Sequence, residues 1–274
     1  MIRKIVVPVD GSAASERIVP HLAELRRAVD AGVNLIHVAG ADLVSQIKGR
    51  DYLKSLEKRA EGILAFDATA LRIGEPAVEI LKHAAAERAG LIALTTRGAS
   101  TLRRVRFGTT AIELLRASRA PLLIVRPEWP VRPFRKILAA IDGAPASRGV
   151  LECVADLARG GEAEVALVRV LFKGDEPEKA ASSLDRTAAL FREKAVRVES
   201  RMVPGDPAKS ILEEAREQDA DLIAIGVFGR RGSDPFFFGS VAESVLLGST
   251  VPVLLFRPGR ATRNSRPLAR GARE

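Results

Sequence analysis

Short, largely apolar segments alternate along the chain with longer segments in which apolar residues recur every three or four positions. The first apolar segment, Ile2–Val9, ends at Asp10, and Ile18, Leu22 and Leu25 then fall on one face of a helix. Segments of the first kind are typical of buried strands, and segments of the second kind of amphipathic helices. Their regular alternation predicts an α/β fold with a parallel sheet and right-handed crossovers.

Turn and capping residues place the boundaries of these elements. Ser12 or Ser15 would cap the first helix, and Pro76, after Glu75, suits the first turn of the third helix. The strands are expected to be apolar throughout, because helices would cover both faces of the sheet. The expected strands are 2–9, 33–39, 69–73, 91–95, 122–126, 136–141, 164–170, 196–203, 221–226 and 252–257, and the later helices are 42–65, 109–118, 146–158, 177–194, 207–217 and 240–248.

The second half of the chain repeats the first, with an offset of 132 residues in the first matched block. Three blocks match in the same order, which predicts two copies of one domain. The blocks are IVVPVDGSAASERIVPHLAEL at Ile5–Leu25 with ILAAIDGAPASRGVLECVADL at Ile137–Leu157, GEPAVEIL from Gly74 with GDPAKSIL from Gly205, and APLLIVRP from Ala120 with VPVLLFRP from Val251.

Prolines separate the two copies. The segment Pro127–Pro133 (PEWPVRP) contains three prolines in seven residues, so a stiff, extended linker is expected. The predicted domains are residues 1–127 and 134–258, followed by a basic tail at 259–274.

Composition indicates a soluble globular protein, with 47% hydrophobic and 28% charged residues. Runs of 18 or more apolar residues do not occur, so no membrane span is expected, and the short apolar start is interpreted as a strand rather than a secretory signal. The single cysteine, Cys153, cannot form an internal disulfide and is expected in the core. A reducing, cytoplasmic location is the simplest expectation.

The net charge of +9 is concentrated at the C-terminus. The segment Arg257–Glu274 contains six arginines and one glutamate, a charge of +5 that leaves +4 for both domains. The tail lacks apolar periodicity and is expected to be disordered. Nucleic-acid binding is therefore not the expected function, although salt-sensitive contact between the tail and an acidic partner stays open as an alternative.

A glycine-bearing loop follows the fourth strand of each half. In the second half, Gly226, Gly229, Gly239 and Ser240 have the spacing G-x2-G-x9-G-S, with Arg230 inside the loop. Glycine allows close backbone approach to a ligand, and free N–H groups at a helix start favour phosphate. Such a spacing could also make turns only, but here it is accompanied by an aspartate after the first strand, and both features occur twice.

The first copy of the loop departs from the second at its start. Thr95 replaces the first glycine, whereas Gly98, Gly108 and Thr109 keep the spacing. Arginines at 103, 104 and 106 could face phosphates. A side chain at position 95 could narrow this site, so the second half is the better candidate.

Five motifs resemble the universal stress protein family, and the resemblance covers residues 1–258. They are VPVDGSAAS at the start, GEPA or GDPA before the third helix of each half, ADLIAIG at 220–226, GSVAESVL at 239–246, and VPVLL at 251–255. The G-x2-G-x9-G-S element resembles the family's ATP-binding branch. The resemblance implies two tandem, doubly wound, parallel five-stranded sheets of Rossmann-like, adenine nucleotide alpha hydrolase-like type. It also implies that the fifth strands, 122–126 and 253–257, pair these sheets as an internal pseudo-dimer.

The resemblance also implies site residues. In the second half Asp142 and Val170 would flank the adenine, while the ribose and phosphates would be held by Gly226, Gly229, Arg230, Gly239, Ser240 and Val241. The matching positions of the first half are Asp10, Val38, Gly98, Ala99, Gly108, Thr109 and Thr110. The implied ligand is ATP, with Mg²⁺ or Mn²⁺ carried by the phosphates and reached by Asp10 and Asp142 through water.

The expected function is that of an ATP-binding stress-response protein, a sensor or adaptor with at most slow ATP hydrolysis or self-phosphorylation and a protein partner yet to be identified. No general base accompanies the loop. Three alternatives stay open: a nucleotide-free dimerisation or adaptor module, an enzyme of adenylation chemistry, and a tail that binds nucleic acid. A further homodimer of tandem chains is also open. His21, His37 and His83 show no metal-ligand spacing, and His37 is interpreted as a packed strand residue. The role of Phe236–Phe238 inside the loop is undecided.

Overall fold

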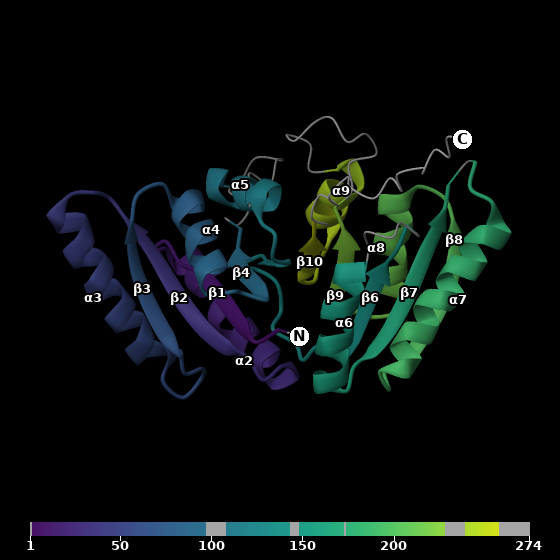
Figure 1. The fold of residues 1–274 in the computed structure, drawn as a ribbon, viewed down its shortest axis with the longest axis horizontal. Coiled ribbons are helices and arrows are strands. Elements are labelled where there is room, and N and C mark those ends of the chain that lie inside the picture. Colours follow the sequence, from purple (N-terminus) through teal and green to yellow (C-terminus); the bar gives the residue numbers. More distant parts are fainter. Residues whose placement is uncertain (1, 97–107, 143–147, 173, 228–238, 258–274) are drawn as a thin grey trace, which may run out of the picture.

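The computed structural model describes residues 2–96, 108–142, 148–172, 174–227 and 239–257. Ten strands form one continuous sheet in the order β3-β2-β1-β4-β5-β10-β9-β6-β7-β8 (Figure 1). Within each half the five strands are parallel, and helices cover both faces, so the predicted α/β class is confirmed.

The predicted elements are present in the predicted order. The first half contains β1 (Lys4–Pro8), α1 (Ala13–Glu16), α2 (Ile18–Ala28), β2 (Gly32–Ala39), α3 (Leu43–Ala60), β3 (Ala68–Ile73), α4 (Pro76–Ala86), β4 (Leu91–Thr95), α5 (Thr109–Ala117) and β5 (Leu122–Val125). The second contains β6 (Lys136–Ala140), α6 (Arg148–Gly161), β7 (Glu164–Leu171), α7 (Pro177–Glu193), β8 (Val198–Pro204), α8 (Pro207–Glu217), β9 (Leu222–Gly226), α9 (Ser240–Gly248) and β10 (Val253–Phe256).

The two halves meet through their fifth strands, as the family resemblance implied. β5 and β10 pair antiparallel, with Leu123 opposite Leu254. All four residues of β5 are buried, because strands flank it on both sides and helices cover both faces. The two predicted five-stranded sheets therefore merge into a single ten-stranded sheet, and the pseudo-dimer lies within one chain.

Three local expectations differ from the structure. The first helix divides after Glu16: Ser12 caps α1 by accepting a hydrogen bond from Ser15 N at 3.1 Å, and α2 then starts at Ile18. The helix expected to reach residue 65 ends at Ala60, close to Gly62, which has a φ of 84°. The strands expected to be apolar throughout are so only in the interior, since the edge strands β3 and β8 have one neighbour each and are largely exposed.

The linker between the halves is packed rather than fully extended. It turns at Pro127–Trp129, where Trp129 N donates to Arg126 O at 3.0 Å. The Trp129 side chain is buried, and the Arg126 guanidinium lies over its ring at 5.1 Å from the centroid. Because the indole is buried, this proline-rich segment packs against the domains instead of forming an extended linker.

Arginines tie the last helix of each half to the other half. Arg126, which follows β5, donates to Leu246 O at 2.7 Å and to Leu247 O at 2.9 Å, near the end of α9. Arg257, at the corresponding position after β10, donates to Arg116 O near the end of α5. Positive charge at a helix C-terminus is favourable, so each helix end is satisfied by its sister half.

Cys153 lies in the core on α6, as the sequence indicated. Burial is the largest cause that raises the pKa of its thiol from 9.0 to about 12. The thiolate is the reactive form, so we expect native labelling by iodoacetamide at pH 8 to be about a thousandfold slower than labelling of the urea-unfolded chain. Since Cys153 is the only cysteine, mass spectrometry reads the rate directly. Equal rates in the two states would contradict the burial.

Candidate functional site

A cavity of about 570 Å³ lies at the carboxyl edge of the second half of the sheet. The ends of β6, β7 and β9 meet there, and α9 begins beside them. The chain passes from β6 to β7 on one side and later returns to β9 on the other, so the cavity lies where strand order reverses. Open α/β sheets bind ligands at such points, and the volume is typical of a small-molecule site.

The structure brings six of the eight predicted residues of the second half together around this cavity. The lining residues from that prediction are Asp142, Val170, Gly226, Gly239, Ser240 and Val241. They come from the ends of three strands and the first turn of one helix, so their convergence is a property of the tertiary fold. Gly229 and Arg230, together with the Phe236–Phe238 run, lie outside the described residues.

Gly239 and Ser240 form the N-terminus of α9. Gly239 is the N-cap, with φ 93° and ψ 118°, a conformation that a residue with a side chain rarely adopts. Ser240 is exposed in the first helical turn and lines the cavity. The N–H groups of this turn have no partner within the helix, and no side chain of Gly239 can cap them. The helix start therefore presents donors and the positive dipole end to the cavity.

Sequence reasoning missed four polar or aromatic residues that line the same cavity: Arg169, Phe172, Asp175 and Asp206. Arg169 Nη2 pairs with Asp175 Oδ2 at 3.1 Å, and the same oxygen accepts from Phe172 N at 3.1 Å. This turn holds the half-exposed Phe172 ring at the end of β7. Two signals were available, the turn-forming Gly174-Asp175 pair and the GDPA motif that contains Asp206, but neither showed that these residues line the cavity.

The matching residues of the first half also lie at the carboxyl edge of their strands. Asp10 accepts hydrogen bonds from Ser12 N at 2.9 Å and from Ser12 Oγ at 2.5 Å. Val38 is half-buried on β2, and α5 begins with Thr109, exposed, and Thr110, half-buried. Gly98 and Ala99 lie outside the described residues.

The two helix starts differ in backbone conformation. Gly108, the N-cap of α5, has a φ of −58°, which any residue can adopt, whereas Gly239 has the left-handed value. The two copies therefore share the glycine in sequence but differ in the backbone conformation of that glycine. Of the two helix starts, only the one in the second half has a backbone conformation that favours glycine.

His37 is packed in its strand, as the sequence indicated. His37 Nδ1 lies 2.8 Å from Val9 O, and because a carbonyl only accepts, this nitrogen carries the proton. His21 and His83 are buried. Within the described ranges, no group of three His, Cys, Asp or Glu side chains could hold a metal ion, and no helix is long and apolar enough to cross a membrane.

Comparison with known proteins gives one consistent result. The model of the universal stress protein family matches residues 1–126 and again 133–257. A universal stress protein from Mycolicibacterium smegmatis is 30% identical over 286 residues, which cover 93% of this chain and 97% of that protein. A universal stress protein from Mycobacterium tuberculosis is 25% identical over 289 residues, covering 92% and 96%.

The fold is matched in solved structures as well. The crystal structure of a universal stress protein from Archaeoglobus fulgidus superposes with a TM-score of 0.74 at 23% identity, covering 93% of this chain and 98% of that one. At this identity the match shows that the two chains share the tandem fold.

Proposed function

Because this chain belongs to the universal stress protein family, we propose that its second half binds ATP at the carboxyl edge of the sheet, between β6, β7, β9 and α9. The observation that carries the proposal is the convergence on one cavity of the six described residues that family resemblance had placed at the nucleotide. Asp142 and Val170 would flank the adenine.

The phosphates would lie at the start of α9. The N–H groups of its first turn, the Ser240 hydroxyl and the backbone at Gly239 supply donors there, and the helix dipole favours negative charge. Mg²⁺ or Mn²⁺ would accompany the phosphates. Asp142 lines the same cavity and would reach the metal ion through a water molecule.

The chemistry of the lining favours binding over turnover. Three carboxylates line the cavity: Asp175 pairs with Arg169, Asp206 accepts from Lys209 N at 3.0 Å, and Asp142 is the one proposed to reach the metal ion. A general base must lie within hydrogen-bond reach of the reacting water, and each of these carboxylates already has an observed or proposed partner. The proposed role is therefore that of a cytoplasmic, nucleotide-dependent sensor or adaptor with at most slow hydrolysis, which acts through a protein partner.

The test is ATP binding measured by isothermal titration calorimetry on the full chain, for wild type and for Ser240→Ala. Loss of one hydrogen bond to a charged group is expected to weaken binding roughly tenfold. Ser182→Ala is the matched control, since Ser182 is exposed on α7 and does not line the cavity. It should bind ATP like wild type.

Two outcomes would contradict the proposal. Absence of ATP binding, together with no nucleotide carried through purification and seen by mass spectrometry, would favour the nucleotide-free adaptor. Tight binding that Ser240→Ala leaves unchanged would place the nucleotide elsewhere. AMP and cyclic AMP, titrated in parallel, show whether the triphosphate is required.

A further inference from the structure

The first half forms one end of the sheet, where β3 has a neighbouring strand on one side only (Figure 1). Gly74 N donates to Ala39 O at 3.4 Å, and Ala39 is the register partner of Ile73. Because backbone groups alternate along a strand, the even-numbered residues of β3 bond β2 and the odd-numbered residues face outward. The N–H and C=O groups of this outward edge can bond a further strand.

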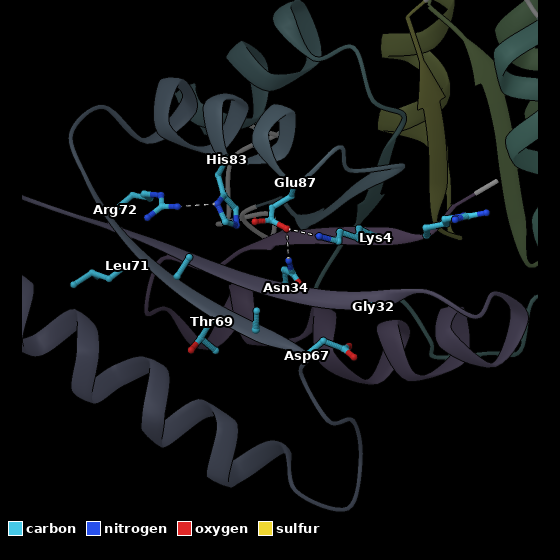
Figure 2. Close-up of a pocket in the computed structure, with 12 residues that line it drawn as sticks. Lys4, Gly32, Asn34, Asp67, Thr69, Leu71, Arg72, His83 and Glu87 are labelled. Atoms are coloured by element: carbon cyan, nitrogen blue, oxygen red, sulfur yellow. Dashed lines mark hydrogen bonds and ion pairs between the residues drawn. The ribbon is translucent and has the colours of Figure 1, made fainter.

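The two faces of β3 are covered differently. On one face α3 lies over both β2 and β3, since a Cβ added to Gly49 of α3 would stand 2.9 Å from His37 Cδ2 and 2.8 Å from Leu71 Cδ1. On the other face, where Figure 2 shows Arg72 beside α4, an open groove of about 610 Å³ runs along β3. Ala68 and Ala70 line this groove, and their short side chains leave it open.

The sister strand β8 fills the corresponding space with a long side chain. Ala70 pairs with Ile36 of β2, and Arg201 pairs with Val168, the residue of β7 that corresponds to Ile36. Arg201 therefore stands where β3 has Ala70, and it lies 3.9 Å from Glu214 Oε2. Of the two ends of the sheet, the β3 end is thus the one that another strand can approach closely.

Exposed apolar side chains are concentrated at the same end of the molecule. The most exposed large hydrophobic residues that the structure describes, at 48–70% exposed, all belong to α3, to the turn after it or to β3. Apolar surface gathered on one unit in this way is typical of an association surface. The residues are Leu43, Val44, Ile47, Ile63 and Ile73.

Charges on the groove and on Arg72 are complementary. Asp67 and Glu87 line the groove, and Glu87 Oε2 accepts from Lys4 Nζ at 2.6 Å (Figure 2). A carboxylate has further acceptor sites after one such bond. Arg72 is exposed and forms no ion pair with any residue that the structure describes; its Nη2 lies 3.3 Å from His83 Nδ1. A second copy of the chain would therefore offer Arg72 the acidic partner that its own chain does not.

We propose that two copies of this chain pair antiparallel through β3, about a two-fold axis at Ala70. In this register Arg72 lies opposite Ala68 of the second copy, so its side chain enters the second copy's groove, which Asp67 and Glu87 line. Ala70 meets Ala70 of the second copy as a non-hydrogen-bonded pair, whose close spacing of about 4.5 Å between Cα atoms suits small side chains. The interface is separate from the proposed nucleotide site and does not depend on it.

The same axis brings the two α3 helices together. Because α3 lies over both β2 and β3, the two helices would be two strand spacings apart, roughly 10 Å, which is an ordinary helix-packing distance. They would run antiparallel, so Leu43 and Ile47 at the start of one helix approach Ile63 beyond the end of the other. The pair is closed and symmetric, and it buries the exposed apolar surface of both copies.

The first test is the mass of the full chain in solution, measured by sedimentation equilibrium over a range of concentrations. Wild type is expected to be a dimer of the 29.4 kDa chain. Ala70→Arg places like charges opposite each other on the axis and should raise the dimer dissociation constant about a hundredfold or more. β8 has Arg201 at the corresponding position, so the fold accommodates this side chain, and circular dichroism checks that it does.

Arg201→Ala is the matched control on the other edge strand and should remain a dimer. Two outcomes overturn the proposal: a wild-type chain that is monomeric up to about 1 mM, and a dimer that Ala70→Arg leaves unchanged.

A second test reads the register directly. Cα atoms about 4.5 Å apart fall within the range that a disulfide spans, so mild oxidation of Ala70→Cys is expected to give a covalent dimer on a denaturing gel. The native Cys153 is buried and does not compete. Arg201→Cys, the control on β8, should stay monomeric on the same gel. Absence of the Ala70→Cys cross-link, or equal cross-linking of both variants, overturns the proposal.

Discussion

Replacing Gly160 with alanine should destabilise the protein by about 3 kcal/mol, although alanine is the better helix former. A Cβ at this position of α6 would stand 1.8 Å from the backbone oxygen of Ala28, at the end of α2. Helix propensity favours the substitution by at most about 1 kcal/mol. Forcing two packed helices apart costs about 1–3 kcal/mol or more, and a backbone oxygen cannot rotate away as a side chain can. The contact joins the two halves, so the loss should appear as a lower urea midpoint for the whole chain.

Gly248→Ala is the control for this effect. Gly248 ends α9, and a Cβ there would stand 2.4 Å from Cδ1 of Leu212, the tip of a flexible side chain. Leu212 can adopt another rotamer, so a cost of no more than about 1 kcal/mol is expected. If the two variants lose the same stability, close backbone contact between α2 and α6 is not what makes Gly160 necessary.

Gly239→Val should reduce ATP affinity in the second half by about a hundredfold. Valine at φ 93° is strained, and relief of the strain requires the N-cap of α9 to rotate. That rotation would turn the first N–H groups of α9 away from the cavity that Gly239 and Ser240 line. Calorimetric titration with ATP, at a temperature where circular dichroism shows the variant folded, measures the loss.

A control variant must show that backbone strain by itself does not reduce ATP affinity. Gly62 has a φ of 84°, and a Cβ added at this position would have no neighbouring atom within 4 Å. It lies between α3 and β3, far along the chain from the cavity. Gly62→Val should therefore cost stability through the same backbone strain while ATP affinity stays at the wild-type value. If Gly239→Val binds ATP with wild-type affinity, the start of α9 does not contact the nucleotide.

The candidate site could be predicted from the sequence as far as its residues belong to repeated local motifs. Gly239 and Ser240 were recognisable because glycine before a helix start has a local meaning, and Asp142 because it ends a strand in both copies. Arg169 and Phe172 could not be found in this way. Their place in the cavity depends on how far β7 extends beyond β6 and on the turn that Asp175 closes, and neither is visible in residue spacing.

The sequence by itself determined the order of strands and helices, the two copies and the residues at each strand end, because hydrophobic period, capping and turn preferences act over a few neighbouring residues. Only the tertiary structure decided that one ten-stranded sheet forms, that Gly160 lies against the Ala28 backbone, and that Glu214 contacts Gln218 and Arg201 whereas His83, at the corresponding helix position, contacts Arg72. These features depend on contacts between residues that are far apart in the sequence. The two halves share a fold through common local patterns, and they differ where single side chains change what packs across the sheet.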